Sequence, residues 1–251
     1  MTQPKLYIIA GCHGAGKTTA SKNVLPELLN CKKFVNADEI AHEINPENVE
    51  AVAMEAGRIM LNQIQELLSS KITFSIETTL ATKSYHKIVK KAQELGYSVI
   101  LLFFWLETPQ LAKMRVRQRV LEGGHNIPED VIVRRYWRGI NNLFEIFMPI
   151  VNAWAVYDNR SETRLIANSD GIINESVWYE IMRRMEERER LELWDKLNVG
   201  LEKSYEKMLK EKIEKKQPVI ISEDGVPKAV PAEDAMRRLI LDLKLRKEGL
   251  L

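Results

Sequence analysis

A glycine-rich stretch close to the N-terminus constrains the fold more than any other part of the sequence. Residues 11–18 read GCHGAGKT and match the pattern G-x-x-x-x-G-K-T. The apolar run Leu6 to Ala10 precedes this pattern, and a helix-permissive segment follows it. A strand, a glycine-rich loop and a helix in this order surround a phosphate group with backbone N–H groups. The stretch therefore predicts a phosphate-binding loop, or P-loop.

The side chains of this loop have separate predicted roles. Lys17 is placed to reach the β- and γ-phosphates of ATP, and the hydroxyl of Thr18 is placed to bind Mg²⁺. We therefore predict ATP and Mg²⁺ as cofactors, with Thr18 as the metal ligand. The predicted nucleotide-binding residues are Gly11, Cys12, His13, Gly14, Ala15, Gly16, Lys17, Thr18 and Thr19.

Short apolar runs alternate with helical patterns over the following part of the chain. The predicted strands after the P-loop cover residues 33–35, 72–76, 97–106, 153–157 and 164–167. The first helix is expected to end or bend at Pro26, another to begin at Asn45-Pro46, and a third to cover residues 82–95 with Gly96 as its C-cap. This alternation predicts an α/β fold of the P-loop NTPase type, with a parallel sheet flanked by helices.

The character of the sequence changes near Glu175. Residues 175–217 are dense in charge and carry apolar residues at helical intervals, which predicts one long or broken helix, weakest at Gly200. Residues 218–230 read as a β-hairpin that turns at Asp224-Gly225, and a closing helix is expected over 231–247. We therefore expect a core domain over 1–174 and a C-terminal helix–hairpin–helix extension over 175–251. Its charge runs favour solvated helix faces over an interaction surface.

Composition narrows the classes of partner and compartment. Lysine and arginine total 37 and aspartate and glutamate 35, so the overall charge gives no argument for nucleic acid or an anionic membrane. No apolar run approaches the length needed to span a bilayer, and the N-terminus has no signal pattern. The two cysteines, Cys12 and Cys31, lack the number and spacing of a disulfide framework or a metal site. These features predict a soluble, cytoplasmic protein.

Acidic residues follow two of the predicted strands, at the edge where open parallel sheets bind their ligands. Asp38 follows the second strand and is placed to orient and deprotonate a substrate hydroxyl. Its alternative role is local, because Asn36 and Glu39 have the spacing of a helix capping box. Glu77 ends the third strand and, with Thr78, is a candidate for substrate binding. The alternative there is a threonine helix cap with an incidental glutamate.

Two basic helices joined by Gly123-Gly124 predict a lid over about residues 108–140. The arginines on these helices are Arg115, Arg117, Arg119, Arg134, Arg135 and Arg138. A lid that closes over ATP would bring guanidinium groups onto the transferred phosphoryl group. The spacing does not decide which arginine contacts phosphate, and solvated arginines on exposed helices are the alternative.

Together these pieces resemble the zeta toxin family of P-loop kinases, and are closest to its shorter chromosomal zeta-like branch. The matching runs extend to about residue 165. They are the P-loop 11–19, Asn-Ala-Asp-Glu-Ile-Ala at 36–41, Ile-Glu-Thr-Thr-Leu at 76–80, the segment from Arg119 through Gly-Gly-His-Asn-Ile-Pro to Arg134-Arg135-Tyr136, and Tyr157-Asp158-Asn159. The order of these runs is more specific than the P-loop alone.

The resemblance implies roles for particular residues. It makes Asp38 the catalytic base, Glu77 a substrate contact, and Arg119 and Arg134 the lid residues that stabilise the transferred phosphate. The predicted catalytic residues are therefore Lys17, Asp38, Arg119 and Arg134. The best-known members of the family phosphorylate a sugar hydroxyl of UDP-N-acetylglucosamine and are restrained by a small antitoxin.

The combined hypothesis is an ATP- and Mg²⁺-dependent kinase with a small-molecule hydroxyl acceptor and an antitoxin or another protein as a possible partner. One enzymatic alternative is another P-loop kinase, acting on an antibiotic or on a polynucleotide 5′-hydroxyl. Nucleic acid is disfavoured, because only Tyr136 and Trp137 lie near the arginines as stacking aromatics. The alternative from another class is a nucleotide-dependent binding module that acts through its C-terminal helices.

Overall fold

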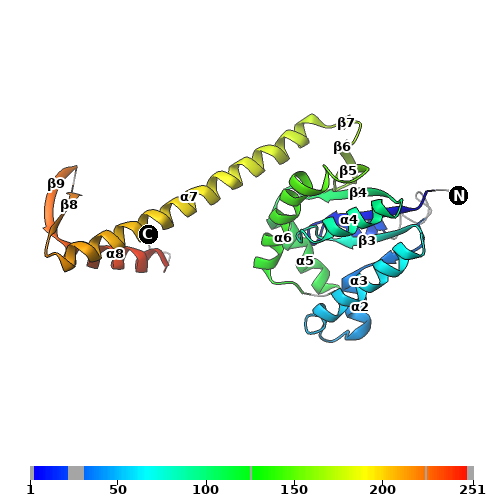
Figure 1. Ribbon diagram of the computed structural model, residues 1–251, viewed down its shortest axis with the longest axis horizontal. Helices are drawn as coiled ribbons and strands as arrows, with labels where there is room; N and C mark the ends of the chain where they lie inside the picture. The colour runs from blue at the N-terminus through cyan, green and yellow to red at the C-terminus, as the bar shows by residue number, and fades with distance from the viewer. Residues whose placement is uncertain (1–2, 22–30, 125, 224, 248–251) are drawn as a thin grey trace. The chain divides into compact units, whose positions relative to one another are not determined.

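The computed structural model describes residues 3–21, 31–124, 126–223 and 225–247. The chain divides into two compact units, Met1–Met182 and Arg183–Leu251, and each is described by itself. Figure 1 labels most of the helices and strands of both units. Pro26, where a helix was expected to end or bend, and Asp224, expected in the hairpin turn, lie outside the described residues. His125 of the Gly-Gly-His-Asn-Ile-Pro run also lies outside them.

The first unit is built on a sheet of seven strands among the described residues, in the order β2-β3-β1-β4-β5-β6-β7. The strands are β1 Lys5–Gly11, β2 Phe34–Val35, β3 Phe74–Thr78, β4 Ser98–Trp105, β5 Ala153–Asp158, β6 Arg164–Asn168 and β7 Gly171–Ile172. The first five strands run parallel, as the sequence predicts. Strand β6 runs antiparallel to β5, since the intervening five residues, 159–163, are too few for a parallel crossover.

Helices flank this sheet, and α3, α4 and α6 each contact one of its strands. The helices of the first unit are α2 Ala37–Ile44, α3 Ala53–Ser69, α4 Tyr85–Glu94, α5 Pro109–Leu121 and α6 Glu129–Asn142, which continues into the π-helical turn η1 Leu143–Phe147. Helix α4 ends as predicted, because Gly96 has a φ of +87° and the N–H of Tyr97 donates to the Ala92 carbonyl at 3.0 Å.

The expected start of a helix at Asn45-Pro46 is wrong, because α3 begins at Ala53. Two asparagine side chains turn the chain before the helix. Asn45 Oδ1 accepts from the Asn48 N–H at 3.0 Å, and Asn48 Oδ1 accepts from the Ala51 N–H at 3.2 Å. Short polar side chains of this kind compete with helical hydrogen bonding, so the helix starts only after both turns are complete.

Helix α6 is fixed firmly at its C-terminal half. Gly139 packs against the Thr79 carbonyl, and Asn142 Nδ2 donates to the Leu80 carbonyl at 2.8 Å. One turn earlier, the Tyr136 hydroxyl donates to the carbonyls of Leu106 and Glu107 at 2.7 and 2.9 Å. These buried contacts attach the second lid helix to the ends of β3 and β4.

Helix α7, Glu175–Glu214, begins in the first unit and continues into the second. In the first unit its Trp178 ring stacks on Trp154, with ring centroids 6.0 Å apart. The helix runs through Gly200 without a break, so the position expected to be its weak point remains helical.

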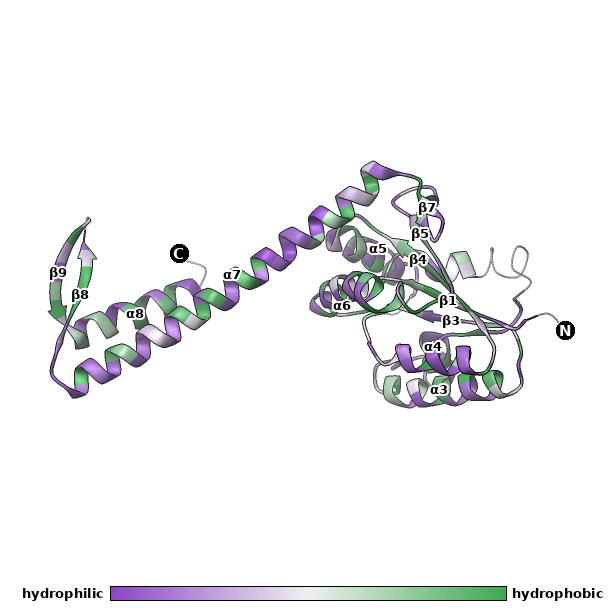
Figure 2. Cartoon of the chain, turned by 45° about the horizontal axis from the view of Figure 1, so that its top comes forward, coloured by the Kyte–Doolittle hydropathy of each residue, from purple (hydrophilic) through white to green (hydrophobic). Residues whose placement is uncertain are grey.

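The second unit has a small hydrophobic core of its own. It contains the rest of α7, the antiparallel hairpin of β8 Pro218–Glu223 and β9 Val226–Pro231, and α8 Ala232–Lys247. The core consists of Leu209, Val219, Ala232 and Ala235. The hairpin and closing helix agree with the sequence prediction, and Gly225 in the turn has a φ of +79°. Figure 2 shows that the middle of α7 is largely hydrophilic with separate hydrophobic positions.

Among the described residues there is no helix whose length and apolar character together would suit a membrane crossing.

We predict that Gly139→Ala destabilises the first unit by about 1–3 kcal/mol, because overpacking forces the backbone to shift. A Cβ at this position would lie 2.5 Å from the Thr79 carbonyl oxygen. Urea unfolding followed by tryptophan fluorescence measures the change.

The matched control is Gly57→Ala in α3, where nothing lies within 4 Å of an added Cβ. This substitution should raise stability by about 0.5–1 kcal/mol, since alanine suits a helix interior better than glycine. If both variants gain stability, the close packing of α6 on Thr79 does not exist in solution.

Candidate active site

Strand β1 ends at Gly11, where the P-loop begins, and a helix begins at Lys17. Gly16 has a φ of +76°, and a Cβ there would lie 2.5 Å from Asn159 Nδ2, so this position requires glycine. The side chain of Lys17 is only 6% exposed, and its Nζ donates to the Cys12 carbonyl at 3.0 Å. The loop thus holds its lysine in a buried position against its own backbone.

Glu77 contacts the two polar residues that open this helix. Strand register explains the contact, because Ile9 of β1 pairs with Glu77 of β3 and the P-loop follows directly. Thr18 Oγ1 donates to Glu77 Oε2 at 2.9 Å, and Lys17 Nζ lies 3.7 Å from Oε1. Burial raises the pKa of the Glu77 carboxyl, while Lys17 and the Thr18 hydroxyl act to lower it.

Asp38 lies in the first turn of α2. The N-cap of this helix is Asn36, whose side chain accepts from the Asp38 N–H at 2.8 Å. Because the asparagine caps the helix, the carboxylate of Asp38 is available to face the cavities beside the P-loop. Asn36 caps the helix and Asp38 lines both cavities, so the two alternatives that the sequence left open are compatible.

Two adjoining cavities meet at these residues. The first, of about 690 Å³, is lined by the P-loop, by Glu39 and His42 of α2, and by Arg115 and Arg119 of α5. The second, of about 550 Å³, is bounded by the end of β3, the start of α3 and the lid helix α6. The side chains that line both cavities are His13, Lys17, Asn36, Asp38, Val49 and Glu77.

Thr78 was predicted to bind substrate together with Glu77, and it lines the second cavity. Its hydroxyl accepts from the Leu80 N–H at 3.0 Å, which stabilises the turn after β3. Tyr85 lies in the same wall, and burial raises the pKa of its hydroxyl. Sequence reasoning had not selected Tyr85, because it lies five residues beyond the Ile-Glu-Thr-Thr-Leu run, on a separate helix.

The lid arginines occupy different environments. Arg119 lines the first cavity, and Gly124 packs against its side chain. Arg134 lines the second cavity but is half-exposed, and its Nη1 lies 3.8 Å from Asp130. Arg135, which was not chosen from the sequence, contacts the P-loop directly, with Nη1 2.8 Å from His13 Nε2. Since neighbouring helical residues point about 100° apart, only the orientation of α6 distinguishes Arg135 from Arg134.

Other basic residues of the lid are engaged outside the cavities. Glu129, at the start of α6, pairs with Lys113 at 3.0 Å and also with Arg117. These pairs lower the pKa of the Glu129 carboxyl. They connect the two lid helices to each other.

The donor set beside the P-loop suits a magnesium ion. The Thr18 hydroxyl and the carboxylate of Glu77 offer hard oxygen atoms, which Mg²⁺ prefers. No cluster of three or more His, Cys, Asp or Glu side chains able to hold a metal was found in the described part of the chain. Such a site fits Mg²⁺ that takes most of its remaining ligands from phosphate and water.

Comparison with known proteins identifies the family of the part of the chain that contains this site. The model of the family described as Zeta toxin matches residues 1–170. The chain belongs to the Zeta toxin family. The match covers the P-loop, Asp38, Glu77 and the helices α5 and α6. An uncharacterized protein of Haemophilus influenzae is 30% identical over 134 residues, which are 53% of this chain and 94% of that protein.

Solved structures show the same fold for this Zeta toxin family chain. A structure from the PezAT chromosomal toxin–antitoxin system of Streptococcus pneumoniae has a TM-score of 0.55 at 21% identity, over 77% of this chain and 88% of that chain. The AvrRxo1-ORF1:AvrRxo1-ORF2 structure with sulphate ions has a TM-score of 0.59 at 18% identity, over 71% and 63%. Both likenesses establish a P-loop kinase fold with a mostly parallel sheet and flanking helices.

The second unit gives a separate match. A domain of unknown function (DUF8506) covers residues 185–240, which lie within the unit Arg183–Leu251. The zeta toxin match and this match do not overlap.

We predict that the thiol of Cys12 in the folded protein does not react with iodoacetamide at pH 8. Burial raises its pKa from 9.0 to about 11, so the thiol stays protonated until the pH approaches that value. In a Cys31→Ser variant, mass spectrometry should find Cys12 unlabelled in the native protein and labelled in urea. Rapid native labelling at pH 8 would show that the loop opens.

Proposed function

We propose that this protein is an ATP- and Mg²⁺-dependent kinase that transfers the γ-phosphate to a hydroxyl of a small molecule. One observation carries the proposal: the two cavities share Lys17, Asp38 and Glu77. A nucleotide in the first cavity and an acceptor in the second would therefore meet beside a cation and two carboxylates. Phosphoryl transfer needs this arrangement, since its catalysis is mainly positioning and charge stabilisation.

The residues divide the work by their positions. Lys17 binds the β- and γ-phosphates, and Asp38 orients the acceptor hydroxyl and takes its proton. Glu77 holds Thr18 and Lys17 in place and faces the acceptor side. Thr18, with the Glu77 carboxylate beside it, would hold Mg²⁺, which supplies positive charge to the phosphate oxygens when bound.

The lid supplies further positive charge. We propose that Arg119 contacts the nucleotide phosphates from the first cavity and that Arg134 and Arg135 face the transferred group or the acceptor from the second. Arg135 is the better placed of the two on α6, because it already contacts His13 in the P-loop.

The acceptor is proposed by class. The hydroxyl-bearing residues Thr78, Thr79, Thr82 and Tyr85 line the second cavity together with the α6 arginines, which suits a polar molecule that carries an anionic group. A UDP-N-acetylamino sugar has this chemistry, and membership of the Zeta toxin family supports it as the first acceptor to test. Another small molecule or a polynucleotide 5′-hydroxyl would be identified by the same acceptor panel.

A protein partner is proposed on similar grounds. The PezAT structure comes from a toxin–antitoxin system, and the AvrRxo1 structure contains two proteins. We propose that this chain also has an antitoxin or another protein partner, and that it acts in the cytoplasm, where ATP is available.

We predict that Asp38→Asn lowers kcat by about 10²–10⁴-fold while nucleotide affinity is kept, because the lost group acts only on the acceptor proton. Lys17→Ala should weaken ATP binding as well. The assay measures ATP consumption with Mg²⁺ across nucleotide sugars, sugars, nucleosides and 5′-hydroxyl oligonucleotides.

Asp170→Asn serves as the matched control, because Asp170 lies in the exposed turn between β6 and β7. Its turnover should equal that of the wild type. ATP binding without stimulation by any acceptor would contradict the kinase proposal and favour a nucleotide-dependent binding module.

A second prediction separates the two lid arginines. Arg135→Ala should lower kcat by about 10²-fold, because it removes a donor beside the P-loop, and Arg134→Ala should lower it less. Arg138, which is exposed on the same helix, provides the control Arg138→Ala, with turnover unchanged. A larger loss in Arg134→Ala would restore the assignment made from the sequence.

A further inference from the structure

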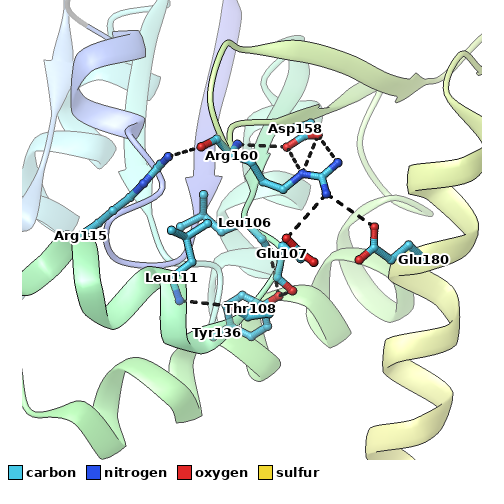
Figure 3. A network of polar contacts seen from close by, with 9 residues as sticks. All are labelled: Leu106, Glu107, Thr108, Leu111, Arg115, Tyr136, Asp158, Arg160 and Glu180. Carbon is cyan, nitrogen blue, oxygen red and sulfur yellow. Dashed lines mark hydrogen bonds and ion pairs between the residues drawn. The ribbon is translucent and has the colours of Figure 1, made fainter.

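A network of polar contacts surrounds Arg160, in the loop that joins β5 and β6 (Figure 3). Its Nε donates to both carboxylate oxygens of Asp158 at 3.1 and 3.0 Å, and its Nη2 donates to Oδ2 at 2.8 Å. The guanidinium carbon also lies 5.4 Å from the centroid of the Trp105 ring. A guanidinium that forks onto a carboxylate and faces an aromatic ring has a well-defined orientation.

Two further carboxylates face the same guanidinium. Nη1 lies 3.7 Å from Glu107, just after β4, and 3.8 Å from Glu180, in the early turns of α7. Arg160 therefore brings together three acidic side chains from three segments (Figure 3). Without its charge, Asp158, Glu107 and Glu180 would repel one another and the loop would lose its fixed position.

The loop makes two contacts with the P-loop. Asn159 Nδ2 donates to the Ala15 carbonyl at 2.7 Å. The backbone carbonyl of Arg160 accepts from Arg115 Nη2 at 2.7 Å, and Nη1 of the same arginine lies 3.3 Å from the Gly14 carbonyl. Two consecutive P-loop carbonyls are thus bound by donors that depend on the position of this loop.

These contacts determine where a P-loop amide points. In a planar trans peptide, the C=O of one residue and the N–H of the next point in opposite directions. Because Asn159 binds the Ala15 carbonyl, the N–H of Gly16 is directed to the other side of that peptide. Gly16 lines the first cavity, where the nucleotide phosphates are proposed to bind.

We propose that Arg160 is a positioning residue for nucleotide binding. It fixes the 159–163 loop, and through Asn159 and Arg115 the loop orients the P-loop peptides before any phosphate arrives. The inference rests on the proposed function, because it assumes that the first cavity binds nucleotide. It goes beyond that function in assigning a role in phosphate binding to a side chain that does not line the cavity.

The test measures the affinity of the full-length protein for Mg·ADP by calorimetry, well below the melting temperature of each variant. Arg160→Ala should weaken binding roughly tenfold, as expected for loss of one coupled polar network. Arg160→Lys keeps the charge without the forked contact and should weaken it less. The control is Arg164→Ala. Arg164 is a neighbouring, exposed arginine, and its ion pair with Glu162 at 3.0 Å lies at the protein surface.

A double variant distinguishes positioning from general loosening of the structure. Because Arg160 acts partly through Asn159, the double variant Asn159→Ala, Arg160→Ala should lose less affinity for Mg·ADP than the product of the two single losses. Affinity losses that multiply would overturn the inference, as would a folded Arg160→Ala protein with wild-type affinity. If Arg160→Ala does not fold, Arg160→Lys replaces it in both comparisons.

Failure of the proposed function gives a different result. If the first cavity does not bind nucleotide, the wild-type protein itself would not bind Mg·ADP, and both proposals would fall together. Nucleotide binding without acceptor-dependent turnover would remove only the kinase proposal. Wild-type binding with unchanged binding in the Arg160 variants removes only the positioning role.

Discussion

The buried contact between Glu77 and the last residues of the P-loop is the interaction on which the rest of the site depends. It joins the end of β3 to Lys17 and Thr18, and the parallel pairing of β1 with β3 makes it possible. A buried ammonium group requires a nearby negative charge, and a buried carboxylate requires hydrogen-bond donors. Each group supplies what the other needs, so the site has its charged groups in place before a ligand binds.

Several features of the fold were predictable because local patterns determine them. The P-loop motif follows an apolar strand, and the β4 segment is a continuous apolar run, so both strands were recognised from short stretches of sequence. The cap at Asn36 and the positive φ at Gly96 are likewise properties of a few neighbouring residues. The same patterns placed Asp38 and Glu77 at the carboxyl ends of adjacent strands.

Features that depend on tertiary contacts were not predictable in this way. The rotation of α6 decides that Arg135 reaches His13, and that rotation is fixed by the packing of Gly139 and Asn142 far along the helix. The late start of α3 comes from paired asparagine turns, which resemble an ordinary helix entry in the sequence. The role of Arg160 requires residues from β4, β5, α5 and α7 to meet, and no spacing in one segment indicates this.

The hydrogen bond from Lys17 to the Cys12 carbonyl has a consequence for ligand entry. The ammonium group is already withdrawn from bulk water and held by a neutral acceptor of the protein. An arriving phosphate would therefore replace one hydrogen-bond partner by a more strongly attracting one, and much of the desolvation of this cation would already have occurred during folding. Part of the desolvation free energy of binding an anion is therefore already spent on folding. A neutral ligand in the same place would make no strong electrostatic interaction with Lys17 to compensate for it.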